Sequence, residues 1–333
     1  MKDKETKKET KKNKTENEPE RNVEEEVELE EFYQKYINEC RFTGCLRPET
    51  IRGYRAVFSL FQKVMPEVTS TELLTTSMLN EFFKRIQIRQ RIVGKNTLKT
   101  GVKKSTIKTQ WTKLNVFFKW LKENNHILEN PLKGIKPPRV SYNDFKRLEN
   151  NEVNQIYSAI IRSSRGALIS RRDTLMISLL LYLGVRKGEF ISLQIKDIDL
   201  IKKEITIRGE TSKSGQTRII PLHPTLLLHL KDYIEERNRH HLRTEYLLVS
   251  TTKDKGLSKD GLKHWVNRII KISDVKFHLH QFRHTFACKI TENGTPTASL
   301  QKLMGHADIS MTAKYTRSLR AENMRRDIEM IAL

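Results

Sequence analysis

The stretch HQFRHTFACKITENGTPTASLQKLMGHADISMTAKY, residues 280–315, combines helical periodicity with several polar side chains. Its apolar residues recur at helical spacing and predict helices. Because His280 and Arg283 are three residues apart, a helix projects both side chains from one face toward a common ligand. His306 follows Arg283 by 23 residues, and Tyr315 follows His306 by nine. We therefore expect this segment to build a polar site on a helical scaffold.

A second polar cluster precedes it, in the sequence Gly184-Val-Arg-Lys-Gly-Glu189. The apolar run 175–183 predicts a buried helix that ends near Gly184, because glycine adopts the left-handed conformation common just after a helix. Arg186 then opens a new helix, where its planar guanidinium and the free N–H groups of the helix start both favour an anion. The sequence therefore predicts an anion-binding turn at this point.

A β-hairpin is predicted between these two segments. Ile205 and Ile207 alternate with polar neighbours, and the run 218–222 follows Thr211-Ser-Lys-Ser-Gly215, which places Lys213 near the turn. From about residue 145 onward the pattern thus predicts helices with a short inserted sheet. The expected helices lie near 153–161, 175–183, 226–236, 262–270, 281–291 and 297–303.

Residues 27–130 predict a separate helical domain. Apolar residues recur there at helical spacing in four stretches, which gives each helix one buried face. Ser105 is a good N-cap for the fourth helix. The expected core residues are Leu29, Phe32, Tyr33, Tyr36 and Ile37; Ile51, Tyr54, Phe58 and Phe61; Met78, Leu79, Phe82, Phe83 and Ile86; and Ile107, Trp111, Leu114, Phe117, Phe118 and Leu121.

The other side of the fourth helix is basic. Six cations lie before this helix, on its polar side or in the preceding loop: Lys103, Lys104, Lys108, Lys113, Arg89 and Arg91. Such a face on a compact bundle suits the phosphates along a DNA groove. The alternative, a solvated charged face that binds nothing, remains open.

Three further segments complete the predicted organisation. Residues 131–144 form a linker, because the paired Pro137 and Pro138 forbid a continuous helix. Residues 1–26 hold almost no apolar side chain, so ordering them buries nothing, and we expect a disordered charged tail. Residues 316–333 carry apolar residues among charges, and they form either a C-terminal helix, docked on this domain or on a neighbouring copy, or a frayed terminus.

The charge of the chain points to a polyanionic partner. Its 62 Lys and Arg exceed 40 Asp and Glu, for a net charge of +22 over 333 residues. Residues 1–27 hold eight basic and nine acidic residues, so the remaining 306 residues carry +23, which suits double-stranded DNA. Three irregularly spaced cysteines fit neither a disulfide framework nor a zinc motif. The longest apolar stretch falls far short of the ~20 residues that span a bilayer. We expect a cytoplasmic, nucleoid-associated protein.

His280, His284 and Cys288 recur at helical spacing and raise the question of a metal site. Eight residues of helix rise about 12 Å, too far for the first and last to share an ion with bonds near 2 Å. A continuous helix therefore excludes a site built from all three. A pair formed by His280 and His284 with distant ligands remains an alternative to a structural role for His284, and we expect no metal.

Transfer of a phosphodiester without a metal needs a nucleophile, cations that hold the phosphate oxygens, and an acid for the leaving oxygen. The chain offers each of these groups, in the order Arg186, Lys213, His280 with Arg283, His306 and Tyr315. Each fragment alone is common. Their residue types, order and spacing together resemble the tyrosine recombinase and phage integrase family, in an Xer-like pattern. The resemblance covers about residues 28–333.

The resemblance implies a role for each matching residue. Tyr315 attacks the scissile phosphate and becomes linked to a DNA 3′ end. Arg186 and Arg283 bind the non-bridging oxygens, and Glu189 orients Arg186. Lys213 protonates the departing 5′ oxygen. Proton transfer at the phenol is assisted by His280, and the phosphate accepts a hydrogen bond from His306.

Two features of the chain complicate these assignments. Phe282 stands where the family often has leucine, which affects packing more than chemistry. Hairpin alignments slip easily, so Lys202, Lys203 and Lys253 remain alternatives to Lys213.

We therefore predict a mainly α protein with a small β-sheet. A helical, SAM-like core-binding domain over 27–130 precedes a mixed α+β catalytic domain over 145–333. The implied function is site-specific DNA recombination through a 3′-phosphotyrosine, without cofactor or ATP, by a homotetramer on DNA that exchanges C-terminal helices. We expect it to integrate or excise a mobile element. A type IB topoisomerase or telomere resolvase, and a regulator that binds DNA without catalysis, are the alternatives.

Overall fold

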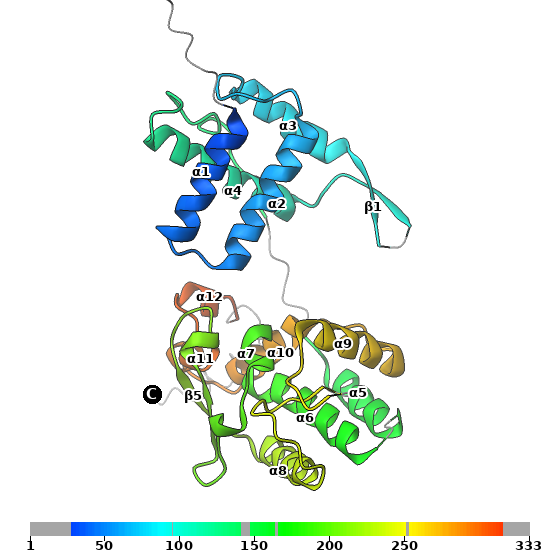
Figure 1. Cartoon of the computed structure of the whole chain (residues 1–333). Helices are drawn as coiled ribbons and strands as arrows, with labels where there is room; N and C mark the ends of the chain where they lie inside the picture. Colours follow the sequence, from blue (N-terminus) through cyan, green and yellow to red (C-terminus); the bar gives the residue numbers. More distant parts are fainter. Residues whose placement is uncertain (1–27, 95, 141–146, 164–165, 251–252, 316–333) are drawn as a thin grey trace, which may run out of the picture. The chain divides into compact units, whose positions relative to one another are not determined.

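A computed structural model describes residues 28–94, 96–140, 147–163, 166–250 and 253–315 (Figure 1). The chain divides into two compact units, Met1–Ser141 and Tyr142–Leu333. The predicted tail 1–26 and the predicted C-terminal helix within 316–333 lie outside the described residues. Among the helices that are described, none is long and apolar enough to cross a membrane.

The first unit packs the four predicted helices around an aromatic core. The ring of Tyr33 stacks on Phe58 with centroids 3.7 Å apart, and Phe117 meets both rings edge-on. The predicted apolar faces are confirmed, since their residues are buried or pack against this core. The helices are α1 (Leu29–Phe42), α2 (Pro48–Val64), α3 (Thr76–Ile88) and α4 (Lys104–Glu123).

The segment before α4 differs from its prediction. Where we expected a loop, β1 (Gln90–Val93) and β2 (Thr97–Thr100) form an antiparallel hairpin that projects from the bundle (Figure 1). Both of its faces are largely exposed, so no alternation of buried and polar residues announces the strands. The predicted N-cap at Ser105 is also wrong, because Lys103 is the N-cap and Ser105 lies in the first turn of α4.

The first residues of the predicted linker pack on this helical unit. Leu132 is buried in its core. The Thr76 hydroxyl donates to the carbonyl of Pro131 over 3.1 Å, and the Trp111 indole N–H donates to the carbonyl of Ile135 over 2.7 Å. These contacts cannot be predicted from the sequence, because the prolines and glycine of this stretch signal only that a helix stops.

The second unit is built around α6 (Ala167–Leu183). This helix is buried on nearly all sides and packs against α5 (Asn150–Ser163), α8 (Pro224–Arg239) and α10 (Leu279–Glu292). α9 (Lys259–Ser273) packs on α5. The predicted helices of this unit are confirmed.

A small antiparallel sheet and three short helices complete the unit. β3 (Ile198–Asp199), β4 (Glu204–Ile207) and β5 (Arg218–Pro221) form the sheet in that order, which confirms the predicted hairpin around Lys213. α11 contacts both β5 and α10. The short helices are α7 (Lys187–Ile191), α11 (Thr297–Met304) and α12 (Ser310–Ala313).

Candidate active site

One pocket of the second unit gathers all six residues predicted to be catalytic. It has a volume of about 340 Å³. The chain reaches it from the start of α7, the segment between β4 and β5, the first turns of α10, and the residues around α12. Its lining residues are Arg186, Lys213, Ser214, His280, Arg283, His284, His306, Ala307, Met311, Lys314 and Tyr315.

Arg186 enters the pocket from a tight turn. Gly184 ends α6 in the left-handed conformation, with φ of 56°, as predicted, and Arg186 is the N-cap of α7. The backbone N–H of Arg186 donates to Glu189 Oε2 over 2.9 Å, and its Nη1 donates to Oε1 over 3.0 Å. Nη2 donates to the carbonyl of Gly305 over 3.0 Å. Glu189 and the C-cap residue of α11 thus hold the Arg186 side chain in place.

Glu189 has a second partner, Arg218, that is absent from the predicted site residues. Arg218, at the start of β5, donates to both carboxylate oxygens of Glu189, over 3.2 and 2.8 Å, and its Nε donates to the carbonyl of Leu303. Burial by itself raises the pKa of Glu189, but the hydrogen bonds and charges of Arg218 and Arg186 outweigh it and lower this pKa to about 2. The signal was an arginine at an inward position of an alternating strand, where an unpaired charge is costly.

Arg283 is a buried cation in the wall of the pocket. Its residue is 1% exposed, and its guanidinium donates to the carbonyls of Gly184 and Met304. Burial, followed by the nearby charge of Arg186, lowers the pKa of Arg283 to about 9, which leaves it protonated at neutral pH. Arg186 donates to the same Met304 carbonyl, and two guanidinium groups that share an acceptor in a partly buried site favour a bound anion with several oxygens.

The phenol of Tyr315 lines the same pocket, and the Tyr315 residue is 3% exposed. Burial raises the pKa of Tyr315 to about 12, against the opposing charge of Arg283, so the phenol is protonated at neutral pH. The phenol oxygen lies 2.9 Å from Nδ1 of His284. The sequence predicts His280 at the phenol and a structural role for His284, and the structure adds His284 as a hydrogen-bond partner of the phenol. The rings of the two histidines meet edge-on, with centroids 4.4 Å apart.

The His306 ring is held by a hydrogen bond with the buried Thr312 hydroxyl. Its Nδ1 lies 2.8 Å from the Thr312 hydroxyl, and its ring is nearly parallel to that of Tyr315. Burial, then the charge of Arg283, lowers the pKa of His306 to about 4. The pKa of His280 is lowered by the same two causes. Both rings are therefore neutral at physiological pH, so each can donate one hydrogen bond and accept another.

Lys213 lines the pocket on the exposed segment between β4 and β5. Its neighbour Ser212 is buried and donates to Glu189 Oε1 over 3.1 Å, which ties this segment to the guanidinium cluster. The alternatives Lys202, Lys203 and Lys253 are not among the described residues that line the pocket.

The described structure bears on the metal alternative raised by His280, His284 and Cys288. Cys288 is buried in a small apolar cluster. Within the described parts of the chain, no three His, Cys, Asp or Glu side chains come together as metal ligands.

The six predicted DNA-binding cations lie in the first unit. Lys103, Lys104 and Lys108 are exposed on α4, and Arg91 is exposed on β1. Arg89 is the C-cap of α3 and is half-buried. Lys113 differs from this group, because it is half-buried and its ammonium lies 6.0 Å from the centroid of the Tyr54 ring.

Comparison with known proteins identifies this constellation. A profile of the phage integrase family matches residues 146–322. The chain belongs to this family. It is a tyrosine recombinase, an enzyme that cleaves and rejoins DNA, which confirms the resemblance and the predicted class of enzyme.

Individual relatives agree with this assignment. The tyrosine recombinase XerA of Thermococcus kodakarensis is 31% identical over 209 residues, which cover 62% of this chain and 70% of the relative. The tyrosine recombinase XerC of Proteus mirabilis is 24% identical over 284 residues, covering 81% and 84% of the two chains.

Two solved structures share the fold. The Tn1549 transposon integrase, in complex with a circular intermediate DNA, has a TM-score of 0.70 at 17% identity and covers 90% of this chain and 99% of its own. The XerH site-specific recombinase bound to a palindromic difH substrate has a TM-score of 0.67 at 21% identity, with 89% and 83% covered. The predicted fold class is therefore confirmed.

Proposed function

We propose that Tyr315 is the nucleophile of this recombinase and that the other predicted pocket residues serve its phosphoryl transfer. The phenol oxygen attacks the scissile phosphorus, the bond to the 5′ oxygen breaks, and a 3′-phosphotyrosine forms. A 5′ hydroxyl from the same or a second DNA reverses the reaction. The observation that supports this proposal is the convergence of six residues from distant parts of the sequence on one pocket.

Each cation of the pocket suits one part of the reacting phosphate. Arg186 and Arg283 bind the non-bridging oxygens, where negative charge grows in the transition state. Because backbone carbonyls and Glu189 already hold these guanidinium groups, little reorganisation accompanies the reaction. Lys213, on an exposed segment, protonates the departing 5′ oxygen. His306 donates a hydrogen bond to the phosphate, and His280, whose ring meets that of His284 edge-on, assists proton transfer at the phenol by supporting this neighbour.

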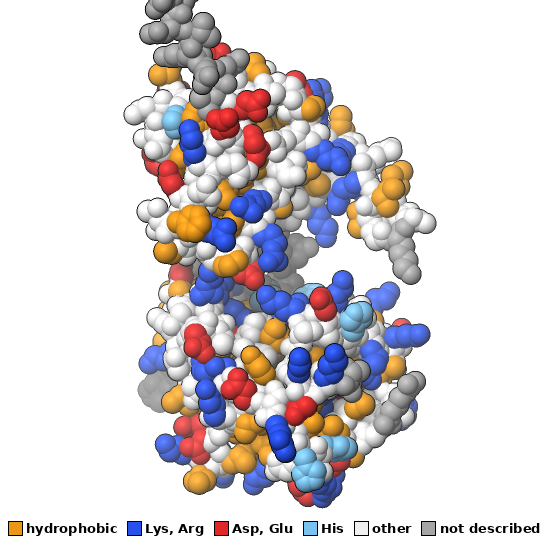
Figure 2. Space-filling view, viewed as in Figure 1, with side chains coloured by type: hydrophobic (Ala, Val, Ile, Leu, Met, Phe, Trp, Pro, Cys, Tyr) orange, Lys and Arg blue, Asp and Glu red, His pale blue; other side chains and the backbone are white. Residues whose placement is uncertain are grey.

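Double-stranded DNA is the proposed partner of both units. In the first unit, Lys and Arg side chains gather where the β1–β2 hairpin leaves the helices (Figure 2). Arg91 and Lys99 face each other across this hairpin. Like charges at such positions repel each other, and the negative charge of a phosphate bound beside them would offset this repulsion. With Lys103, Lys104 and Lys108 they form a cationic face for the DNA backbone.

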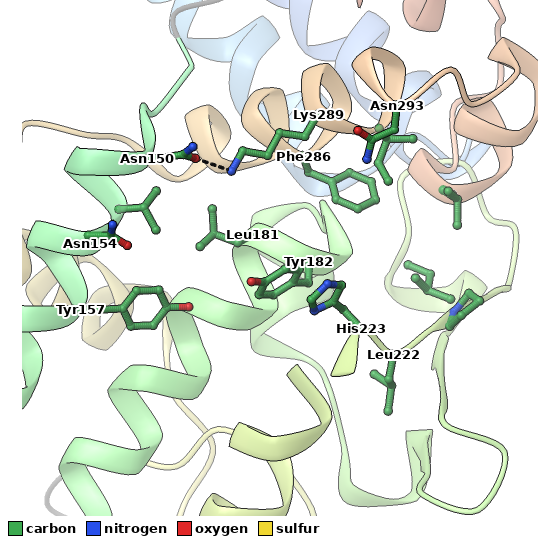
Figure 3. A pocket seen from close by; sticks show the side chains of 15 residues that line it. Asn150, Asn154, Tyr157, Leu181, Tyr182, Leu222, His223, Phe286, Lys289 and Asn293 are labelled. Atoms are coloured by element: carbon green, nitrogen blue, oxygen red, sulfur yellow. Dashed lines mark hydrogen bonds between the residues drawn. The ribbon is translucent and has the colours of Figure 1, made fainter. Parts of the chain in front are cut away.

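The assembly we propose is a tetramer on DNA, in which the segment 316–333 of one copy docks on the next. A second pocket, of about 740 Å³, opens between α5, the end of α6, β5 and α10 (Figure 3). Leu181, Leu222 and Phe286 contribute apolar surface to it, and the rings of Tyr182 and His223 stack on one another. The segment 316–333 offers apolar side chains of matching chemistry: Leu319, Met324, Ile328 and Ile331.

The docking proposal predicts a separation of cleavage from assembly. Replacing Leu319 and Ile328 by aspartate should leave strand cleavage at a single site intact and abolish higher-order complexes on DNA. Gel filtration of the protein–DNA complex measures the second effect. Wild-type assembly by the double variant would reject docking through this segment.

The nucleophile is tested by trapping the covalent intermediate. Wild-type protein is incubated with a library of nicked genomic duplexes, from which the cleaved strand diffuses away, and the DNA that survives denaturation on the protein is sequenced. Tyr315→Phe should trap none. Tyr246→Phe, a half-exposed phenol on the surface of the same unit, should trap as much as wild type.

The sequenced DNA also tests the biological use. A single site at the ends of one element supports integration or excision of a mobile element. Trapping without sequence preference, together with relaxation of supercoiled DNA, would instead indicate a topoisomerase. A covalent adduct that persists in Tyr315→Phe would overturn the assignment of the nucleophile.

A further inference from the structure

The hydrogen bond between Tyr315 and His284 assigns a function to a residue outside the predicted catalytic set. The phenol oxygen of Tyr315 lies 2.9 Å from Nδ1 of His284. We propose that His284 accepts the proton of this phenol as Tyr315 attacks the phosphate, and returns it when the phosphotyrosine bond breaks. The inference rests on the proposed role of Tyr315 as nucleophile.

The position of His284 is held by its neighbours on α10. Arg283 and Thr285, on either side of it, are buried. The Thr285 hydroxyl donates to the carbonyl of Gln281 over 2.9 Å and accepts from the backbone N–H of Leu148 over 2.8 Å. The His284 ring lies against the edge of His280 and at a tilt to Tyr315, with a centroid distance of 5.7 Å to the latter. A base must be within hydrogen-bond reach and oriented, and this ring meets both conditions.

The charges around His284 keep its ring neutral. The titratable groups that line the same pocket are Arg186, Lys213, His280, Arg283, His306, Lys314 and Tyr315, and His278 and Cys288 lie close by. Burial first, then His280, His278 and Arg283, lowers the pKa of His284 to about 4. A neutral imidazole with its proton on Nε2 has a lone pair on Nδ1, to which the phenol O–H can donate a hydrogen bond.

The pKa values of Tyr315 and His284 indicate at which stage of the reaction the phenol proton moves. In the free enzyme a phenol with a pKa near 12 does not surrender its proton to a histidine with a pKa near 4. A bound phosphate changes both groups, because its negative charge offsets the arginines that disfavour imidazolium, and the phenol oxygen loses basicity as it bonds to phosphorus. The transfer therefore accompanies bond formation rather than preceding it.

The complete step is balanced. The O–H bond of Tyr315 breaks as the O–P bond forms, and His284 becomes an imidazolium. The bond from phosphorus to the 5′ oxygen breaks, and that oxygen takes a proton from Lys213. In the reverse reaction a 5′ hydroxyl gives its proton to Lys213, and the imidazolium of His284 protonates the departing phenolate.

The test compares His284→Asn with wild type on the nicked duplex identified by trapping. The asparagine oxygen occupies a position close to Nδ1, so it can hold the phenol but cannot accept its proton. We expect single-turnover cleavage to fall by about 10²- to 10³-fold, and its rate to rise about tenfold for each pH unit because hydroxide must replace the base. His241→Asn, on an exposed turn where φ is positive and asparagine is tolerated, should behave as wild type.

His284→Ala provides a second measurement. Added imidazole should restore part of its cleavage, because a small base can enter the space that the ring vacates. If His284→Ala fails to fold, the pH profile of His284→Asn decides alone. Cleavage by His284→Asn within about threefold of wild type, or with an unchanged pH profile, would overturn the proposal.

Two further outcomes have defined meanings. The first concerns His280→Asn and His280→Ala. If these variants show the hydroxide dependence and the imidazole rescue and the His284 variants do not, the base is His280 and our inference is wrong. Loss of the adduct in Tyr315→Phe combined with normal cleavage by His284→Asn would reject this inference and leave the proposed function standing.

Discussion

Removing the charge of Glu189 should destabilise the second unit by an amount that the structure predicts. The carboxylate is fully buried and accepts hydrogen bonds from Arg186, Ser212 and Arg218. Its pKa falls from an ordinary 4.5 to about 2, which corresponds to roughly 3 kcal/mol in favour of the charged, folded form at neutral pH. Glu189→Gln keeps the size of the side chain but turns an amide toward guanidinium donors, so we expect a loss of about 3 kcal/mol.

The assay must report on the second unit alone. Trp265 belongs to this unit, whereas Trp111 and Trp120 belong to the first. Urea unfolding followed by fluorescence, with both of the latter replaced by phenylalanine in parent and variant, isolates the relevant transition. Glu210→Gln is the matched control, because Glu210 pairs with Arg208 in an exposed position, and its loss should stay below about 1 kcal/mol.

The pH dependence provides the sharper test. A carboxyl group whose pKa is lowered by folding stabilises the protein fully above its unfolded value of 4.5 and loses this contribution as the pH falls toward 2. The difference between parent and Glu189→Gln should therefore be greatest at neutral pH and shrink below 4.5. The buried histidines titrate in both proteins and cancel. Two results would refute this prediction: a loss of unfolding free energy under about 1 kcal/mol at neutral pH, or a loss at acid pH as large as the loss at neutral pH.

Two other substitutions probe how the fold holds the site. Gly184→Ala places a Cβ 2.3 Å from the Phe286 ring at a φ of +56°, so thermal melts should show a loss of unfolding free energy of about 2 to 4 kcal/mol from strain and overpacking. The control, Gly294→Ala, is also at positive φ but has no atom within 4 Å of the new Cβ, and it should lose about 1 to 2 kcal/mol. Equal losses in the two variants would show that the contact with Phe286 does not matter. Thr312→Val removes the hydroxyl that holds His306. Single-turnover cleavage should fall about tenfold while DNA affinity is unchanged, and an unaltered rate would show that His306 needs no such support.

Local patterns in the sequence predicted most of the helical elements. The apolar stripes of α1 to α4, the left-handed end of α6 at Gly184 and the hairpin around Lys213 follow from periodicity and backbone preference, which act over a few residues. The β1–β2 hairpin escaped prediction because neither of its faces is buried, so its sequence carries no alternation. The cap of α4 was misplaced because a serine inside the first turn looks like a serine before it.

The sequence also predicted residues that line one pocket, through the types and spacing of Arg186, Arg283, His306 and Tyr315, since a phosphoryl transfer needs those chemical groups whatever the scaffold. Their partners were not visible. The ion pair of Arg218 with Glu189 joins a strand to a helix 29 residues away, and the hydrogen bond of His284 with Tyr315 spans 31 residues.

The amino-acid order therefore determined which elements form and which functional groups are present, because propensity, periodicity and residue chemistry are local properties. Tertiary packing decided which buried charge is paired with which, and which imidazole lies at the phenol, because those choices depend on directions and distances between segments that only the folded chain brings together.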